Sequence, residues 1–233
     1  MSGTLYGLGV GPGDPELLTL KALRLLKSCP TLAYLAGMSG ESMARGIVAE
    51  HLTGQQREIV LPMSFDPAPG AADAAYDQGA QAIAEELAAG RDVAVLCEGD
   101  PFFFGSFQYL YNRLSGRFPV QVVPGVSSVM AASAELGLPL TARNDALAVI
   151  PATRPEEEIA GLLDSADAAA IMKLGRHLPR ILDLLDRLGL SEKARYIERV
   201  GLPAQRILSL AEARASGAPY FSIILISKRS AVP

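Results

Sequence analysis

Four short glycine-containing loops hold the residue types that could bind a ligand, and each follows an apolar run typical of a β-strand. The four loops read GVGPGD after YGLG, EGDPFFFG after DVAVLC, PGVSS after VQVV, and KLGR after AAAIM. In open α/β sheets ligands bind beyond the carboxyl ends of the strands. The four loops are therefore the candidate functional site.

The EGDPFFFG loop has the most specific chemistry. Glu98 and Asp100 flank Gly99, and Pro101 leads into three phenylalanines. Two carboxylates disfavour a phosphate, but they suit a cation that also carries ribose hydroxyls and an adenine ring. S-adenosylmethionine (SAM) is such a ligand. The structural alternative is that Asp100 and Pro101 cap the following helix and the phenylalanines pack into the core.

The first and third loops exclude some familiar sites. In the first, the third position of a dinucleotide fingerprint G-x-G-x-x-G holds Pro12, and no G-x-x-x-x-G-K-[ST] motif occurs. Asp14 is a good N-cap, and Pro15 follows it at the first helical position. In the third loop Ser127 is a candidate N-cap beside amides that could still bind ligand. G-x-S-x-G is absent, so a hydrolase elbow is not supported.

Strand-like and helix-like runs alternate along the chain, which predicts an α/β fold with a mostly parallel sheet. Helices are expected at Pro15–Lys27, Ser42–Leu52 and Ala71–Ala89, and another from Ser128. The pattern breaks at Leu138–Asp145. We therefore expect two domains, residues 1–141 and 142–233. The second is expected to be smaller, with a mixed sheet and one long helix over Pro179–Leu188.

Composition limits the classes of function. Of the 233 residues, 49% are hydrophobic and 20% charged, and the net charge of -4 is no footprint for nucleic acid. No secretory signal or membrane-spanning stretch stands out, so the expected location is the cytoplasm. Cys29 and Cys97 are too separated for a metal cluster and are expected to be core residues. His51 and His177 form no zinc-binding pair, so no metal is expected.

Taken together, the loops resemble those of the tetrapyrrole methylases, the class III family of SAM-dependent methyltransferases. The matching stretches are GLGVGPGDPELLTLKA, CEGDPFFFGS, VVPGVSS, IMKLGR and PYFSIILI, in the family order and over nearly the whole chain. The resemblance implies two α/β domains with a cofactor cleft between them, SAM as co-substrate and a homodimer. It also implies that Gly11–Gly13 keep side chains away from the ligands.

Carried over motif by motif, the resemblance implies contacts to SAM from nine residues. They are Pro12, Gly99, Asp100, Phe103, Ser127, Ser128, Met172, Val200 and Phe221. The contact at Val200 is open, because the family often has a glycine at this point and this sequence reads ERVG. Met172 has core packing as its alternative role.

The substrate that the resemblance implies is a reduced tetrapyrrole, precorrin-2, methylated at carbon 20 in cobalamin biosynthesis. Its many carboxylates need cationic partners. The candidates are Arg143, Lys173, Arg176 and His177, for each of which a solvated surface position is the alternative. No catalytic residue is assigned, and the base that takes the carbon 20 proton is open among Glu98, Tyr109 and Tyr111.

Several other functions stay open. The same methylation could act on the cobalt-containing substrate of the anaerobic pathway, cobalt-factor II. Other relatives methylate ribosomal RNA or a modified histidine on a protein, and the acidic balance disfavours RNA as the substrate. An oxidoreductase with a degenerate dinucleotide loop lacks the expected acidic residue. A non-catalytic tetrapyrrole carrier would bind the substrate and leave SAM unconsumed.

Overall fold

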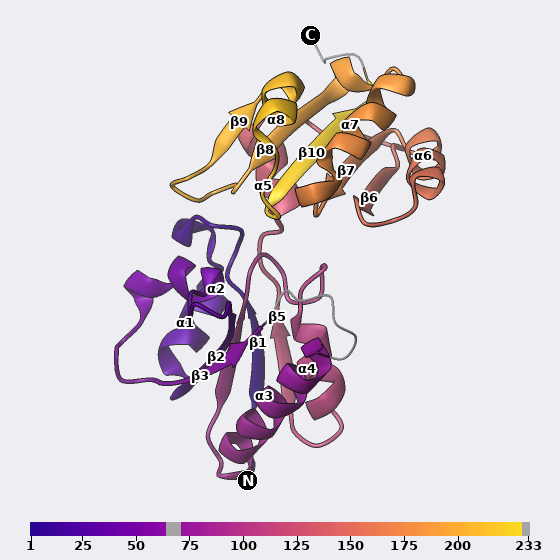
Figure 1. The fold of residues 1–233 in the computed structure, drawn as a ribbon. Coiled ribbons are helices and arrows are strands. Elements are labelled where there is room, and N and C mark those ends of the chain that lie inside the picture. Colours follow the sequence, from indigo (N-terminus) through magenta and orange to yellow (C-terminus); the bar gives the residue numbers. More distant parts are fainter. Residues whose placement is uncertain (64–70, 230–233) are drawn as a thin grey trace. The chain divides into compact units, whose positions relative to one another are not determined.

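The computed structural model describes residues 1–63 and 71–229. The chain forms two compact units that divide between Ser127 and Ser128. We call residues 1–127 the N-terminal unit and the chain from Ser128 onward the C-terminal unit, and each is described by itself (Figure 1). In the part of the chain that the structure describes, no helix is long and apolar enough to cross a lipid bilayer.

The N-terminal unit is built on a parallel sheet, as the alternating pattern predicts. Its strands lie in the order β3-β2-β4-β1-β5, and every neighbouring pair is parallel. They are β1 (Leu5–Gly9), β2 (Thr31–Ala36), β3 (Arg57–Pro62), β4 (Val93–Cys97) and β5 (Val120–Val123). Because the strands are parallel, their carboxyl ends meet at one edge. The loops that follow β4, β1 and β5 are therefore neighbours.

The helices of this unit are shorter than the sequence suggests. They are α1 (Leu20–Ser28), α2 (Met43–Ile47), α3 (Ala71–Ala88) and α4 (Phe107–Leu114), with 3-10 turns at Pro15–Leu17 and Ala49–His51. The single helix expected over Pro15–Lys27 is wrong, because Thr19 starts a second one. Its hydroxyl oxygen accepts a hydrogen bond from the backbone N–H of Ala22 at 3.1 Å, which is an N-cap.

One face of the sheet packs against α3 and α4. Leu5, Ala33 and Val95 from three neighbouring strands share a buried cluster with Ile83 and Phe107 from these helices. Glycine is required in β1 for this packing. A Cβ at Gly7 would lie 2.5 Å from the Cε1 atom of Phe107. The ring of Phe107 thus takes the space that a side chain at Gly7 would need.

A buried ion-pair cluster lies at the opposite edge of the same sheet, where the strands begin. Glu86, near the end of α3, has its side chain 3% exposed. It accepts hydrogen bonds from Thr31 Oγ1, from Arg57 Nη1, and from both Nε and Nη2 of Arg91. The Arg91 hydrogen bond, aided by Thr31 and Arg57, outweighs burial and lowers the pKa of Glu86. Both carboxylate oxygens are therefore fully used within the protein.

The C-terminal unit has a mixed sheet, as expected. The strand order is β6-β7-β10-β8-β9, in which β6 and β7 are parallel and the other neighbours antiparallel. The strands are β6 (Leu147–Pro151), β7 (Ala168–Met172), β8 (Ala194–Glu198), β9 (Arg206–Leu208) and β10 (Ser222–Ser227). β10 pairs with both β7 and β8, so it is the centre of the sheet.

More helices cover this sheet than expected. They are α5 (Ser128–Glu135), α6 (Glu156–Ser165), α7 (Leu178–Arg187) and α8 (Leu210–Ser216), with 3-10 turns at Gly175–His177 and Ser191–Lys193. The expectation of one long helix is wrong, because α6 is as long as α7. The start of α8 is marked in the sequence by a helix-capping motif. Ser209 and Glu212 form a capping box, with Ser209 N–H donating to Glu212 Oε2 at 2.8 Å.

The boundary between the units lies earlier than the expected division at residues 141 and 142. The reason is the packing of α5. This helix contacts β10 at the centre of the second sheet. In addition, Gln205 Nε2 donates to Glu135 Oε2 at 2.8 Å, which ties the last residue of α5 to the β8–β9 connection. Residues 136–146, which follow α5, are therefore inside the C-terminal unit.

Candidate functional site

Three of the four predicted loops lie side by side at the carboxyl edge of the N-terminal sheet. We call them together the acidic edge: residues 10–19 after β1, 98–106 after β4 and 124–127 after β5. Gly11 and Gly99 exchange backbone hydrogen bonds across the first two loops, at 3.3 Å to the oxygen of Gly99 and 2.8 Å to that of Gly11. The prediction that these loops form one region is thereby supported by direct contacts.

The glycines of this edge bring the loop backbones together. A Cβ at Gly125 would lie 2.1 Å from the carbonyl oxygen of Gly99, and a Cβ at Gly9 would lie 2.5 Å from the nitrogen of Gly125. Gly11 and Gly99 also have positive φ angles of 78° and 64°, which favour glycine. The bare backbone at Gly9 and Gly125 therefore serves contact between the loops.

Asp100 ties the second loop to the third. Its Oδ1 accepts hydrogen bonds from the backbone N–H groups of Phe102 and Phe103 at 2.9 and 3.1 Å. Its Oδ2 accepts one from the N–H of Gly125 at 3.1 Å. Asp100 therefore shapes the second loop and joins it to the third, and a contact of its carboxylate with a ligand stays a prediction.

Two further carboxylates of this edge, Glu98 and Asp14, have local structural partners as well. Glu98 Oε1 accepts a hydrogen bond from the backbone N–H of Ala44 in α2 at 3.1 Å. Desolvation raises the pKa of Glu98. Asp14 Oδ1 accepts from the N–H of Glu16 at 2.8 Å, so Asp14 is the predicted N-cap. Both side chains therefore fix the geometry of the loops at this edge.

The acidic edge fits a positively charged ligand with an aromatic group. Its loops contain four carboxylates and neither lysine nor arginine. Phe102, Phe103 and Phe104 are 51%, 37% and 41% exposed, so three consecutive aromatic side chains are accessible to a ligand here. Pro12 is buried, and Ser127 and Ser128 are half-buried. Like charges disfavour phosphate here, whereas a sulfonium with an adenine ring matches both features.

The remaining predicted SAM contacts lie at one edge of the C-terminal sheet. Met172 at the end of β7 pairs with Ile223, and Glu198 at the end of β8 pairs with Ser222, so both strand ends meet the start of β10. Phe221 immediately precedes β10 and is 44% exposed. Val200 is buried and lies two residues after the end of β8. This edge brings Met172, Val200 and Phe221 into one region.

The four predicted substrate cations do not form one cluster in this unit. Lys173 follows β7, and exposed Arg176 and half-buried His177 belong to the next turn. Arg143 precedes β6, which runs parallel to β7 with Leu147 beside Ala168. Arg143 is therefore at the opposite edge of the sheet from Lys173.

His177 differs electrostatically from its neighbours. Burial lowers the pKa of His177, and the charges of Arg176 and Arg180 lower it further. A lowered pKa favours the neutral imidazole at physiological pH. The interpretation of His177 as a cationic partner is therefore not supported by its surroundings, although it remains able to hydrogen-bond.

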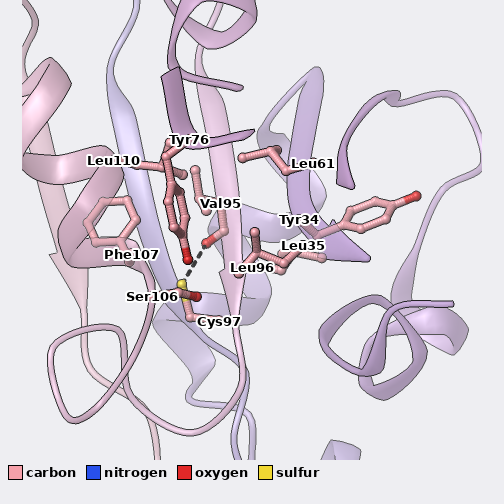
Figure 2. Close-up of a pocket in the computed structure, with 10 residues that line it drawn as sticks. All are labelled: Tyr34, Leu35, Leu61, Tyr76, Val95, Leu96, Cys97, Ser106, Phe107 and Leu110. Carbon is pink, nitrogen blue, oxygen red and sulfur yellow. Dashed lines mark hydrogen bonds between the residues drawn. The ribbon is translucent and has the colours of Figure 1, made fainter. Parts of the chain in front are cut away.

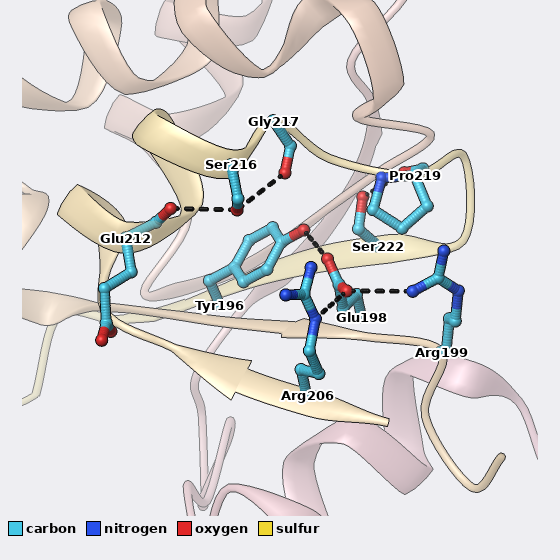
Figure 3. A network of polar contacts seen from close by, with 9 residues as sticks. All are labelled: Tyr196, Glu198, Arg199, Arg206, Glu212, Ser216, Gly217, Pro219 and Ser222. Carbon is cyan, nitrogen blue, oxygen red and sulfur yellow. Dashed lines mark hydrogen bonds and ion pairs between the residues drawn. The ribbon is translucent and has the colours of Figure 1, made fainter. Parts of the chain in front are cut away.

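Sequence reasoning missed a buried polar network at this edge, shown in Figure 3. The side chain of Glu198 is fully buried. Its Oε2 accepts from the Tyr196 hydroxyl at 2.7 Å, and its Oε1 accepts from Arg206 Nε at 2.6 Å and Arg199 Nη1 at 3.1 Å (Figure 3). The stretch YIERVGLPAQRI drew attention to this region, but only the strand register shows that Glu198 and Arg206 are opposite each other.

The protonation states follow from these contacts. Burial by itself raises the pKa of Glu198, but hydrogen bonds from Arg206 and Tyr196, with the two arginine charges, lower it overall. Burial, followed by the bond to Glu198, raises the pKa of Tyr196. The network is therefore a carboxylate, a neutral phenol and two guanidinium groups.

The candidate bases and the cysteines have packing roles. Tyr109 and Tyr76 have ring centroids 4.8 Å apart, and Tyr111 lies 5.1 Å edge-on from Phe102. Cys97 donates a weak hydrogen bond to the Val95 carbonyl beside a void of about 10 Å³ (Figure 2). Such a void is about the size of one water molecule. Burial raises the pKa of Cys97 well above its ordinary value and that of Cys29 to about 12, so both are inert core thiols, as expected.

In residues 1–63 and 71–229, no three His, Cys, Asp or Glu side chains converge as a metal-binding set.

Comparison with known proteins decides the family. The profile of the Tetrapyrrole (Corrin/Porphyrin) Methylases matches residues 4–214. The chain belongs to this family. A Sinorhizobium sp protein named Precorrin-2 C(20)-methyltransferase is 41% identical over 232 residues, which covers 96% of this chain and 95% of the relative. A Salmonella typhimurium Cobalt-precorrin-2 C(20)-methyltransferase is 37% identical over 235 residues, covering 98% of each.

Other relatives differ in length or are known by structure. The Cobalamin biosynthesis protein CobIJ of Mycobacterium tuberculosis is 41% identical, but this tetrapyrrole methylase spans only 46% of its length. Uroporphyrin-III C-methyl transferase from Thermus thermophilus, solved with S-adenyl homocysteine, has a TM-score of 0.70 at 25% identity, covering 97% of this chain and 92% of its own. Cobalt precorrin-4 methyltransferase, CbiF, has a TM-score of 0.74 at 23% identity, covering 96% and 94%, and shows the shared fold alone.

Proposed function

We propose that this tetrapyrrole methylase transfers the methyl group of SAM to carbon 20 of precorrin-2, giving precorrin-3A in cobalamin biosynthesis. The observation that carries the proposal is the 41% identity to the Sinorhizobium Precorrin-2 C(20)-methyltransferase over nearly all of both chains. The charge of the acidic edge agrees with it, because a sulfonium cation suits loops that hold four carboxylates and no basic residue.

The proposed cofactor contacts follow the family motifs. In the N-terminal unit they are Pro12, Gly99, Asp100, Phe103 and Ser127, and in the C-terminal unit Ser128, Met172, Val200 and Phe221. SAM, when bound, supplies an electrophilic methyl group. The glycine backbones, held together by Asp100, would form the wall against which it is bound. That a relative was solved with S-adenyl homocysteine supports this assignment.

The protein's contribution to the reaction is mainly positioning. Carbon 20 of a reduced tetrapyrrole is electron-rich, so no nucleophile from the protein is required. Holding two reactants in line can lower a barrier by about 7 to 11 kcal/mol. The acidic edge would favour the cationic donor, and Lys173 and Arg176 would bind substrate carboxylates. The carbon 20 proton leaves after the new carbon–carbon bond forms.

A cobalt-containing substrate is the second candidate. It rests on the Salmonella relative named for cobalt-precorrin-2, which is 37% identical over 98% of each chain. A metal held inside the macrocycle needs no ligand from the protein. The metal-free substrate is favoured because the Sinorhizobium relative is more similar in sequence.

The test is a pair of incubations with SAM labelled by ¹³C in the methyl group, one with precorrin-2 and one with its cobalt form. We expect one labelled methyl at carbon 20 by NMR, one S-adenosylhomocysteine per turnover, and faster turnover of the metal-free substrate. Binding without methyl transfer by folded protein would instead identify a carrier. Faster turnover of the cobalt form would move the assignment to the anaerobic pathway.

The homodimer is also a proposal. Light scattering after size exclusion should give about twice the 24.6 kDa of one chain. A mass of one chain at micromolar concentration would contradict it. The cytoplasmic location stays a prediction.

A further inference from the structure

Two arginines in the C-terminal unit converge on one oxygen of a buried carboxylate. Arg206 Nε and Arg199 Nη1 both donate to Glu198 Oε1, at 2.6 and 3.1 Å (Figure 3). Tyr196 is neutral and donates to the other oxygen. Glu198 balances one of the two positive charges, so this cluster carries one net positive charge.

Glu198 uses only one nitrogen of each arginine. Across residues 1–63 and 71–229, the Nη atoms of Arg206 and the Nε and Nη2 atoms of Arg199 have no hydrogen bond and no second carboxylate partner. The side chains of Arg199 and Arg206 are 39% and 49% exposed. The unused nitrogens of Arg206 and Arg199 lie on opposite sides of the Glu198 carboxylate (Figure 3), so each arginine could take a carboxylate from solution without displacing Glu198.

The Glu86 cluster of the N-terminal unit shows what a structural cluster of the same composition looks like. There Arg91 uses Nε and Nη2 together on the two oxygens of Glu86, which also accepts from Arg57 and Thr31. That arrangement directs the planar side of the Arg91 guanidinium inward. Arg57 is held by one nitrogen, as are both arginines at Glu198, so the difference lies in Arg91. At Glu198 neither arginine binds the carboxylate through two nitrogens, which leaves most of each guanidinium unused.

The position of the pair also favours a ligand. Arg199 directly follows β8, and its N–H donates to the carbonyl of Phe221 at 2.8 Å. Its φ of 52° is rare for a residue other than glycine. Val200 comes next in the chain. The two arginines therefore lie at the same sheet edge as Val200 and Phe221, which we propose as ligand contacts.

We propose that Arg199 and Arg206, held by Glu198, each bind an acetate or propionate carboxylate of the tetrapyrrole substrate, an inference that rests on the proposed function. A guanidinium group with two unused nitrogens suits a carboxylate because it offers two parallel charge-assisted hydrogen bonds. The carboxylate of SAM is a poorer partner, since an ammonium group stands beside it and the sulfonium is also positive. A tetrapyrrole bears several carboxylates with no such cations.

The experiment compares Arg199→Met and Arg206→Met with Arg91→Met, the matched variant from the Glu86 cluster. Precorrin-2 binding is measured by absorbance titration without SAM, S-adenosylhomocysteine binding by calorimetry, and turnover as kcat and KM. Each Glu198-cluster variant should raise the Kd and KM for precorrin-2 by about tenfold and change kcat and the S-adenosylhomocysteine affinity by less than about twofold. Arg91→Met should leave all four values unchanged.

The outcomes separate the two proposals. An unchanged Kd for precorrin-2 in folded variants overturns the carboxylate site, as does an equal loss of S-adenosylhomocysteine affinity or an equal effect of Arg91→Met. If the parent protein binds precorrin-2 without methylating it, the proposed function fails, while a raised Kd in the variants still supports the site. Arg199→Met retains the hydrogen bonds from Arg206 and Tyr196 to Glu198. This variant alone can therefore test the proposal if Arg206→Met does not fold.

Discussion

The two sheets of this protein end in edges of opposite charge. At the acidic edge of the N-terminal unit, the loops hold Asp14, Glu16, Glu98 and Asp100 without any lysine or arginine. At the corresponding edge of the C-terminal unit, which we call the basic edge, lie Lys173, Arg176, Arg199 and Arg206. The difference matches the two reactants, a cationic methyl donor and a polyanionic tetrapyrrole. Each edge thus carries a charge opposite to that of its proposed ligand.

The two edges are also built differently. The acidic edge is formed by backbone contacts between glycines, with Asp100 joining two loops. The basic edge depends on the buried carboxylate of Glu198, which orients Arg199 and Arg206. Substitutions that add volume should therefore damage the first edge, and substitutions that remove charge should damage the second.

The largest effect is expected from Gly125→Ala. Its Cβ would lie 2.1 Å from the carbonyl oxygen of Gly99, so the loops must separate. Overpacking of this kind costs about 1–3 kcal/mol. We therefore expect S-adenosylhomocysteine affinity, measured by calorimetry, to fall by about tenfold to a hundredfold. The control is Gly116→Ala, where no atom lies within 4 Å of the added Cβ. Full affinity in Gly125→Ala would show that loop contact does not shape the cofactor site.

Glu198→Gln and Glu86→Gln compare the two buried carboxylates directly. Each substitution removes a charge that two arginines neutralise, so each should lower the free energy of urea unfolding at pH 7 by about 2 kcal/mol. Only Glu198→Gln should also raise the Kd for precorrin-2, because only its arginines are proposed to bind ligand. Equal Kd values for the two variants would remove that distinction.

The pH dependence of the same two variants follows from the lowered pKa of each carboxyl group. A lowered pKa contributes stability that is fully present above the ordinary value of 4.5 and is lost as pH falls through the folded-state pKa. The difference in unfolding free energy between the parent and each variant should therefore shrink below about pH 4.5. A difference that stays constant to pH 3 would mean that neither carboxylate is stabilised as charged.

The smallest effect is expected from Asp100→Asn. An amide cannot accept from Phe102, Phe103 and Gly125 all at once, so one hydrogen bond is lost, at about 1 kcal/mol. S-adenosylhomocysteine affinity should fall by about fivefold. Asp14→Asn is a matched control, since Asp14 also precedes a proline but uses one oxygen locally. The same loss in both variants would indicate a charge effect of the whole edge rather than the bond to Gly125.

The sequence predicts features that depend on local patterns. Apolar runs predict β1, β4 and β5, and their glycine loops predict where a site would form. The capping box at Ser209 and Glu212 was available in the sequence and would have predicted α8. Helix α6 was harder to predict because its N-cap position is Pro155, which gives no side-chain hydrogen bond.

The parts of the site that the sequence does not predict depend on contacts between residues far apart in the chain. Gly125 meets Gly99 only because β5 and β4 lie on either side of β1. Glu198 meets Arg206 because of the β8–β9 register. Conversely, Arg143 and Lys173 are both positively charged, but they lie at opposite edges of one sheet. No local pattern predicts such distances.

The central claim, that this chain binds a SAM-type ligand, is tested most directly by calorimetric titration of the parent protein with S-adenosylhomocysteine. We expect saturable binding with one site per chain, unchanged in Arg199→Met and weakened in Gly125→Ala. Absence of binding by protein shown to be folded by circular dichroism would contradict the methyltransferase assignment as a whole.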